Sequence, residues 1–386
     1  MESARLHKAA LVIDTQAPRI NCDLILTERM AEEAMQLIRR GLSRRDARVA
    51  LARLLVNEMR EYPEVRQQMK QIIDTAGVTV SNTTQLGAVS PNCGFSEAIE
   101  MTASTRGLVD VLSPELQVIC SAEDMRKVHA AGAHGVLMNL QNADAFGDNL
   151  DNIELFYNLG IRVVQLTYNR SNLVGGGCTD ADDAGLSYFG REVVKVLNEF
   201  NIMIDLSHCG ERTTWDAIKV SKQPVTFTHT SSYAVCAHDR AKKDDQIKAV
   251  VDTGGFVGVL LVPSFIQQTP QADLGDFVRH VEHIAELVGV ENVGIGTDTG
   301  RCYDWPKQLN SLGQVSSEGA KYARQFDWVG WRAEHRLGQD AKIDGFAKWT
   351  DWPNITEALL SSGMSPDDVR GVLGENFLRV FERIVG

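Results

Sequence analysis

Three short segments decide the fold: NIMIDLSH (Asn201–His208), PVTFTHT (Pro224–Thr230) and NVGIGTD (Asn292–Asp298). Each is an apolar run of about strand length that ends at a possible metal ligand, His208, His229 or Asp298. A continuous apolar run is typical of a strand buried on both faces, as in a parallel sheet covered by helices. In a β/α barrel, polar groups at the carboxyl ends of such strands form the active site. We therefore predict that these side chains converge, where two imidazoles and a carboxylate can hold zinc or another transition metal.

Strand-like and helix-like segments alternate along the chain. Eight segments have the apolar character of strands: Leu11–Asp14, Val78–Ser81, Gly135–Gln141, Ile161–Tyr168, Ile202–His208, Val225–His229, Gly255–Val262 and Val293–Asp298. Apolar residues recur at spacings near three and four, as in amphipathic helices, over Glu28–Arg40, Arg45–Glu61, Asn152–Leu159, Gly190–Glu199, Glu211–Ser221 and Asp276–Val288. This alternation predicts the α/β class and a closed parallel (β/α)8 TIM barrel. No G-x-G-x-x-G motif follows the first strand, so a dinucleotide-binding sheet is not indicated.

The composition is that of a soluble globular protein, with 44% hydrophobic and 23% charged residues in a chain of 386. A net charge of −12 argues against nonspecific nucleic-acid binding, which needs a basic surface. The seven cysteines are scattered without a CxxC pair, which indicates a reducing compartment rather than a disulfide framework. The chain has neither the apolar core of a signal peptide nor an apolar run of about 18 residues. We therefore expect a cytoplasmic protein without a membrane partner.

The chain beyond Cys302 is rich in aromatic residues. They include Trp305, Trp328, Trp331, Trp349, Trp352, Tyr303, Tyr322, Phe326 and Phe346. This density predicts packing in an extension that caps the barrel, with a ligand-binding role as the alternative. We expect a single domain over residues 1–386, with a barrel core at about 10–300 and a helical capping extension at about 301–386. Its last part, Met364–Gly386, is predicted to be two helices, with Ser365 or Asp367 as the first cap and Gly374 between them.

The evidence that any one of these residues binds a metal is weak, because a single histidine at a strand end is more often structural. Three candidates at equivalent positions of three strands favour a site. Hydroxyl residues stand next to His208 and His229, where they leave room and can supply hydrogen bonds that orient the rings. Arg240 follows the sixth strand and is a candidate for clamping a substrate carboxylate through its two-pronged guanidinium, with a surface ion pair as the alternative.

The part of the chain from Asn152 to Phe381 resembles the renal or membrane dipeptidase family, peptidase family M19. The resemblance rests on DLSH at 205–208, the P-x-x-F-[ST]-H-[ST]-S pattern at 224–231, GIGTDTG at 294–300 and VLGENFLRVF at 372–381. It implies a zinc peptidase with an amidohydrolase-like barrel, in which two zinc ions share a bridging Glu. By the same resemblance, His208 and His229 match the ligands of the second zinc. Asp298 matches the carboxylate that handles the proton of the attacking hydroxide, and Arg240 matches the arginine that binds the substrate carboxylate.

The first strand departs from the family pattern, in which an H-x-D pair binds the first zinc. Here the strand reads IDTQAPRINCDL, and an alignment in register puts Gln16 and Pro18 at those two positions. Sliding the motif puts Asn21 and Asp23 there instead, beyond the expected strand end. Neither alignment restores the histidine.

Two further positions differ from the family. The bridging Glu at the end of the third strand is replaced by Gln141, and the histidine after the fourth strand, which contacts the scissile carbonyl, is replaced by Tyr168. An ionised Glu offsets the repulsion between two dications, whereas a neutral amide cannot. We therefore expect fewer than two metals in this chain.

The expected centre is one divalent ion held by His208, His229 and Asp298, with help from Gln141 or Gln16. Zinc is the expected ion, since a single zinc with open positions can activate water. Two histidines and one carboxylate also match the ligand set of non-haem iron. A third possibility has no metal, with the two histidines as acid and base.

Three functions are compatible with these residues. The first is a metal-dependent hydrolase of a dipeptide or a related amino-acid-derived small molecule, with Arg240, Tyr168 and Gln16 as substrate contacts. The second is an enzyme of different chemistry on the same barrel, mononuclear or metal-free, because Gln16, Gln141 and Tyr168 look like a rebuilt polar pocket. The third is a non-catalytic homologue, since a fold alone does not confer activity. The expected partner is a small-molecule substrate, and a homodimer is possible.

Overall fold

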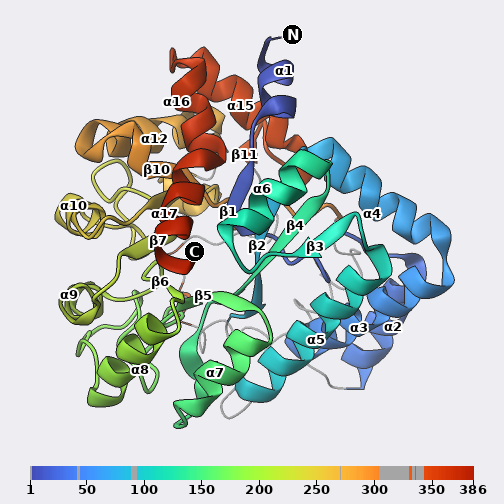
Figure 1. Cartoon of the computed structure of the whole chain (residues 1–386), viewed down its shortest axis with the longest axis horizontal. Helices are drawn as coiled ribbons and strands as arrows, with labels where there is room; N and C mark the ends of the chain where they lie inside the picture. Colours follow the sequence, from blue (N-terminus) through green and yellow to red (C-terminus); the bar gives the residue numbers. More distant parts are fainter. Residues whose placement is uncertain are drawn as a thin grey trace.

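The fold is a barrel of parallel strands surrounded by helices (Figure 1). The computed structural model describes residues 2–40, 44–87, 94–269, 271–303, 330–332, 335 and 343–386. The barrel strands follow one another in the order β1 (Ile13–Ala17), β2 (Val80–Leu86), β4 (His134–Leu140), β5 (Ile161–Gln165), β6 (Met203–Asp205), β7 (Val225–Thr230), β8 (Val257–Val259) and β10 (Val293–Ile295). Every neighbouring pair in this order is parallel. The predicted (β/α)8 TIM barrel is confirmed.

The structure adds strands that the sequence pattern did not predict. β3 (Leu116–Val118) pairs with the first half of β4, where Leu116 lies opposite His134, and β5 pairs with β4 only from Met138 onward. β9 (Ala272–Asp273) and β11 (Ile343–Asp344) form a separate two-stranded parallel sheet. Segments this short carry too little apolar periodicity to be found in the sequence.

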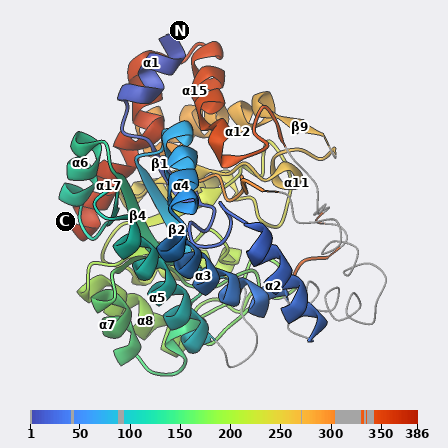
Figure 2. The same ribbon diagram turned by 90° about the vertical axis from the view of Figure 1, so that its right-hand side faces the viewer.

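Helices cover the outside of the barrel. They are α1 (Glu2–Ala9), α2 (Glu28–Arg39), α3 (Arg44–Glu61), α4 (Pro63–Ala76), α5 (Gly94–Leu112), α6 (Ala122–Ala131), α7 (Asp151–Asn158), α8 (Tyr188–Glu199), α9 (Glu211–Val220), α10 (Asp244–Asp252), α11 (Pro263–Ile266), α12 (Leu274–Val288), α15 (Trp352–Ser361), α16 (Pro366–Arg370) and α17 (Asn376–Val385). The six predicted helical segments correspond to α2, α3, α7, α8, α9 and α12. α2, α3 and α5 pack side by side on one flank of the molecule (Figure 2).

The barrel closes between β1 and the end of β10 through hydrogen bonds rather than a regular ladder. The backbone N–H of Asp298 donates to the Gln16 carbonyl at 2.7 Å. The Thr15 hydroxyl, inside the barrel, lies 2.6 Å from the Thr228 carbonyl and 3.0 Å from the Ile295 carbonyl. The backbones approach so closely here that a Cβ at Gly296 would stand 2.3 Å from the Thr228 carbonyl oxygen. Glycine is therefore required at position 296.

Several strands end earlier than the apolar runs predicted. β6 ends at Asp205 and β10 at Ile295, so His208 and Asp298 each lie three residues beyond a strand end. His229, by contrast, lies within β7. The chain turns after β6 because the Asp205 carboxylate accepts the N–H and the hydroxyl of Ser207 at 3.0 and 2.5 Å. The predicted ligands therefore occupy the carboxyl end of the barrel, on loops as well as on a strand.

The described part of the C-terminal extension packs on the barrel, as predicted. Trp349 and Trp352 are almost fully buried. Ser365 caps α16 by accepting the Asp368 N–H. Gly374 separates α16 from α17, and a Cβ there would meet the Leu11 carbonyl oxygen at 2.2 Å. The aromatic residues Trp305, Tyr322, Phe326 and Trp328 lie outside the described residues. The domain boundaries at 1–386, 10–300 and 301–386 stay a prediction.

The amino end of the barrel is closed by α17, drawn in red in Figure 1. Its residues Phe377, Val380 and Phe381 share an apolar cluster with side chains of β1, β2, β4, β5 and β6. No described helix is long and apolar enough to cross a membrane.

Candidate metal centre

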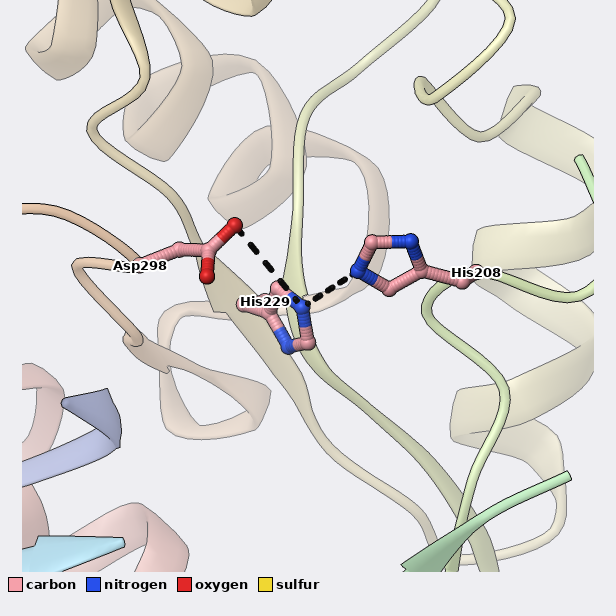
Figure 3. A group of neighbouring side chains, drawn as sticks. All are labelled: His208, His229 and Asp298. Carbon is pink, nitrogen blue, oxygen red and sulfur yellow. Dashed lines mark hydrogen bonds and ion pairs between the residues drawn. The ribbon is translucent and has the colours of Figure 1, made fainter. Parts of the chain in front are cut away.

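Three predicted ligands, His208, His229 and Asp298, come together at the carboxyl end of the barrel (Figure 3). One ligand atom from each lies within 4.8 Å of the other two. The Nε2 atoms of the two histidines are 3.0 Å apart, and His229 Nε2 is 4.0 Å from an Asp298 carboxylate oxygen. Both histidines are buried, whereas the Asp298 side chain is 24% exposed. The centre is therefore enclosed on the histidine side and reaches solvent beside Asp298.

The His208 ring is fixed by two neighbours in the loop after β5. Its Nδ1 lies 2.7 Å from the Asn169 side-chain oxygen, so Nδ1 carries the hydrogen and donates it. The Tyr168 ring stacks on the imidazole at a centroid distance of 4.3 Å and an interplanar angle of 21°. Asn169 has a positive φ of 52°, a conformation that asparagine adopts more readily than most residues. The hydrogen bond leaves His208 Nε2 with a free lone pair.

The His229 ring is fixed by a relay from a buried carboxylate. Asp205 accepts the Thr228 hydroxyl at 2.7 Å, so the hydrogen of that hydroxyl is already used. The Thr228 oxygen therefore accepts from His229 Nδ1 at 2.8 Å. This tautomer leaves His229 Nε2 as an acceptor too, and the Gln141 amide nitrogen lies 3.2 Å from it. Hydroxyl neighbours orient the ring, as the sequence predicted.

The two imidazoles are neutral and face each other with lone pairs. Burial, followed by the Arg240 charge, holds the pKa of His208 and of His229 well below the usual range. Two nitrogen lone pairs at 3.0 Å repel each other unless a cation stands near both. Imidazole nitrogens and a carboxylate are suitable ligands for zinc and related ions. The donor set therefore fits a divalent metal.

Asp298 combines an unusual backbone with a raised pKa. Its φ of 53° puts the residue in the left-handed region, which is rare outside glycine. Burial raises the pKa of its carboxyl group to about 7, with the Arg240 and Arg19 charges opposing the shift and Asp14 adding to it. A carboxyl group that ionises near neutrality can take up or release a proton under ordinary conditions.

A second buried carboxylate, Asp14 on β1, holds the segment that carries Asp298. It accepts the backbone N–H of Thr297 at 2.9 Å and the Thr297 hydroxyl at 2.7 Å. The indole N–H groups of Trp349 and Trp352 donate to the same carboxylate at 2.9 and 3.2 Å. Asp14 therefore links the capping extension to the centre.

The same arrangement occurs twice around the centre. Asp205 accepts the N–H and hydroxyl of Thr228, the residue before His229, as Asp14 accepts those of Thr297, the residue before Asp298. In both cases a carboxylate on one strand fixes a threonine within or just after the neighbouring strand, and the next residue is a candidate ligand. Sequence reasoning missed both carboxylates. The repeated Ile-Asp pairs on β1 and β6 and the threonine before each ligand were the available signal.

The other predicted site residues take different positions. Gln141 and Tyr168 contact the histidines directly. Gln16 lies at the end of β1, where its side-chain oxygen accepts from Asn139 at 3.3 Å and its carbonyl accepts the Asp298 N–H. Arg240 is completely buried, and its guanidinium donates to the Ser207 and His229 carbonyls at 2.5 and 2.8 Å. In the structure Arg240 supports the backbone beneath the histidines, and its contact with a substrate stays a prediction.

Known proteins share this sequence pattern and this barrel. A family model described as membrane dipeptidase (peptidase family M19) matches residues 62–317. Dipeptidase tcpJ of Claviceps purpurea is 25% identical over 280 residues, which cover 72% of this chain and 57% of that protein, less than two thirds of its length.

Two solved structures have the same architecture. An amidohydrolase from Pseudomonas aeruginosa is 28% identical, with a TM-score of 0.75 over 100% of this chain and 99% of its own. A metallopeptidase from Rhodobacter sphaeroides, liganded with a phosphinate mimic of the dipeptide L-Ala-D-Ala, is 20% identical, with a TM-score of 0.68 over 86% of this chain and 96% of its own. At that identity the second likeness is one of fold.

Proposed function

The chain belongs to the membrane dipeptidase family, peptidase family M19, and from this premise we propose that it is a metal-dependent hydrolase of a dipeptide or a related amino-acid amide. One observation carries the proposal. Two neutral imidazoles, each with its hydrogen fixed on Nδ1, turn their Nε2 lone pairs toward each other beside a carboxylate. Such an arrangement is suited to a cation.

The proposed centre holds one divalent ion, with zinc as the metal. His208, His229 and Asp298 would hold it, and the Gln141 side chain is close enough to contribute. A divalent ion at this point supplies a Lewis acid and lowers the pKa of water to near neutrality. The neutral amide of Gln141 supports a count of one, because two adjacent dications need an anion between them.

Side chains of the protein would carry out proton transfer, bind the scissile carbonyl and orient the imidazoles. Asp298, whose side chain is partly exposed, can accept a proton from the attacking water and pass it to the leaving nitrogen. Tyr168 keeps its phenolic proton, since burial raises its pKa to about 12, so it can donate to the scissile carbonyl. Asn169 and Thr228 keep the two imidazoles in one tautomer.

A metal-free mechanism has less support. It needs a histidine that gains and loses a proton near neutrality. Burial keeps the pKa of His208 and of His229 well below that range. The two rings are therefore better suited to be ligands than to be acid and base.

The proposal extends to the surroundings of the enzyme. The six described cysteines, Cys22, Cys120, Cys178, Cys209, Cys236 and Cys302, form no disulfide, which supports a reducing compartment such as the cytoplasm. The partner is a small-molecule substrate, and we propose a homodimer as the assembly.

The test combines metal content with hydrolysis. Protein as purified and after zinc reconstitution is analysed for metal by mass spectrometry and assayed against a panel of dipeptides. We expect about one ion per chain and release of amino acids from part of the panel. The His208→Gln and His229→Gln variants should lose both properties, whereas His283→Gln, which removes a histidine paired with Asp244 away from the centre, should keep both. Two ions per chain, or no hydrolysis with full metal content, would contradict the proposal.

A further inference from the structure

The guanidinium of Arg19 lies beside the candidate metal centre. A Cβ placed on Gly87 would stand 3.1 Å from Arg19 Nη2, 3.5 Å from the Gln141 side-chain oxygen and 3.7 Å from the Tyr168 ring. Gln141 in turn contacts His229, and Tyr168 stacks on His208. These three groups therefore pack closely around the Gly87 backbone. Arg19 belongs to the same cluster as two residues that touch the histidine ligands.

The backbone around Arg19 is fixed by hydrogen bonds, which set where its side chain begins. Its carbonyl accepts the N–H groups of Cys22 and Asp23 at 3.1 and 2.8 Å, and its own N–H donates to the Asp23 carboxylate at 3.1 Å. The next N–H, of Ile20, donates to the Thr83 hydroxyl on β2 at 3.2 Å. These bonds form a tight turn that places the Arg19 side chain at the carboxyl end of β1.

The Arg19 guanidinium has no counter-ion among the described residues. No described carboxylate lies within ion-pair distance of it, and no described group accepts a hydrogen bond from it. The charges of Arg19, Arg48 and Arg301 all act on the Asp23 carboxylate, which lies 3.5 Å from Arg301. The Arg19 charge also acts on Asp298 at the centre.

Arg240, the other arginine near the centre, is not open to a substrate in the same way. It is completely buried and its guanidinium donates to two backbone carbonyls. Arg19 is only partly buried and has donors to spare.

We propose that Arg19 binds a carboxylate of the substrate next to the metal centre and makes the enzyme selective for acidic over neutral substrates. The inference rests on the proposed function and names the substrate class for the same site. A guanidinium can hold a carboxylate through two parallel hydrogen bonds, and a charged hydrogen bond is worth roughly 1.5–3 kcal/mol. This corresponds to an affinity ratio of about 10-fold to 100-fold between a carboxylate and its amide.

The test compares matched acid and amide ligands on the zinc-loaded protein. The probes are Ala-Ala against Ala-Ala amide, and Asp-Ala against Asn-Ala, with dissociation constants from calorimetry and KM and kcat for any peptide that is cleaved. We expect the wild type to prefer the acid in at least one pair by about tenfold or more. Arg19→Gln should remove most of that preference, through KM and Kd more than kcat. Arg19→Lys should keep part of it, because it keeps the charge and loses the two-pronged geometry.

The control is Arg126→Gln, which removes one positive charge from a surface ion pair with Glu382. It should leave the preference unchanged, and circular dichroism establishes that all variants are folded. An equal preference in wild type and Arg19→Gln would overturn the inference, as would a wild type that does not discriminate in either pair.

A separate arm distinguishes this result from failure of the proposed function. If no peptide binds or is cleaved, inorganic phosphate is titrated into zinc-loaded wild type, Arg19→Gln and Arg126→Gln while thermal stability is measured. If phosphate stabilises the wild type and Arg126→Gln but not Arg19→Gln, the anion site at Arg19 is supported and the proposed dipeptidase activity is rejected. The absence of both peptide and phosphate effects would reject the role of Arg19.

Discussion

His208 and His229 present their Nε2 atoms to each other at 3.0 Å with no hydrogen on either nitrogen. Asn169 accepts a hydrogen bond from Nδ1 of His208, and Thr228 accepts one from Nδ1 of His229. Buried groups hold the two rings in this position although their lone pairs repel each other. A cation removes the repulsion, and the same groups that fix the rings then determine how tightly it is held.

Loss of the Asp205 carboxylate should weaken metal binding. In Asp205→Asn the Thr228 hydroxyl loses an ionised acceptor and is free to donate to His229 instead, which would change the tautomer of the ring. We expect a zinc affinity lower by about 10-fold to 100-fold, measured by competition with a chromophoric chelator. Asp110→Asn, at an exposed position on α5, is the control and should bind zinc like the wild type. Unchanged affinity in Asp205→Asn would show that the relay does not fix the ring.

The bonds to Asp14 should affect stability and metal binding to different degrees. Trp352→Phe removes one donor from the carboxylate and should lower the free energy of unfolding by about 1–3 kcal/mol with little change in zinc affinity. Asp14→Asn removes an acceptor oxygen from the Thr297 and indole donors together, so it should lower both stability and zinc affinity. Chemical denaturation and chelator competition measure the two effects. A Trp352→Phe variant that lost zinc binding more than Asp14→Asn would contradict this order.

The stability of the metal-free protein should depend on Asp298 and pH. The pKa of this carboxyl is about 7 in the folded chain, above its ordinary value of 3.8, so the folded state binds the proton more tightly. The stabilisation from that proton is complete below about pH 4 and is lost as the pH rises through 7. Asp298→Asn should therefore become more stable than the wild type by about 4 kcal/mol at pH 8, and the difference should vanish near pH 4. Urea denaturation of both proteins in a chelator measures this, and a pH-independent difference would contradict the raised pKa.

An acidic residue at position 141 should strengthen the centre. Gln141→Glu places an anionic oxygen beside His229, within reach of the proposed ion. We expect zinc affinity to rise by about tenfold, since a charged ligand replaces a neutral one. Gln223→Glu, at a position on the loop before β7 away from the centre, should have no effect. Metal competition at constant ionic strength measures both variants, and equal affinities would place residue 141 outside the coordination sphere.

The barrel and the ligands could be predicted from sequence, because strongly apolar strands with polar ends carry a clear signal. Seven described helices, α1, α4, α5, α6, α10, α11 and α15, were missed, as were the short strands β3, β9 and β11. The convergence of the candidate ligands after β6, within β7 and after β10 could be predicted because their residue types are unusual at strand ends.

The residues that hold the ligands could not be found in this way. Asp14 and Asp205 lie inside apolar runs, where an acid looks like an interruption of the strand. Their hydrogen-bond partners are distant in the sequence. Arg19 follows a proline in a loop, so nothing in its local sequence indicates that its guanidinium lies near Gln141. These contacts depend on strand order and register, which only the assembled barrel defines.

The bonds from Trp349 and Trp352 to Asp14 join the first strand to residues 335 and 338 positions later in the chain. A folding intermediate in which these indoles have not yet docked lacks two of the donors to the carboxylate that holds Thr297. We therefore expect the loop bearing Asp298 to reach its final geometry, and the centre its full affinity for an ion, only once both indoles are in place.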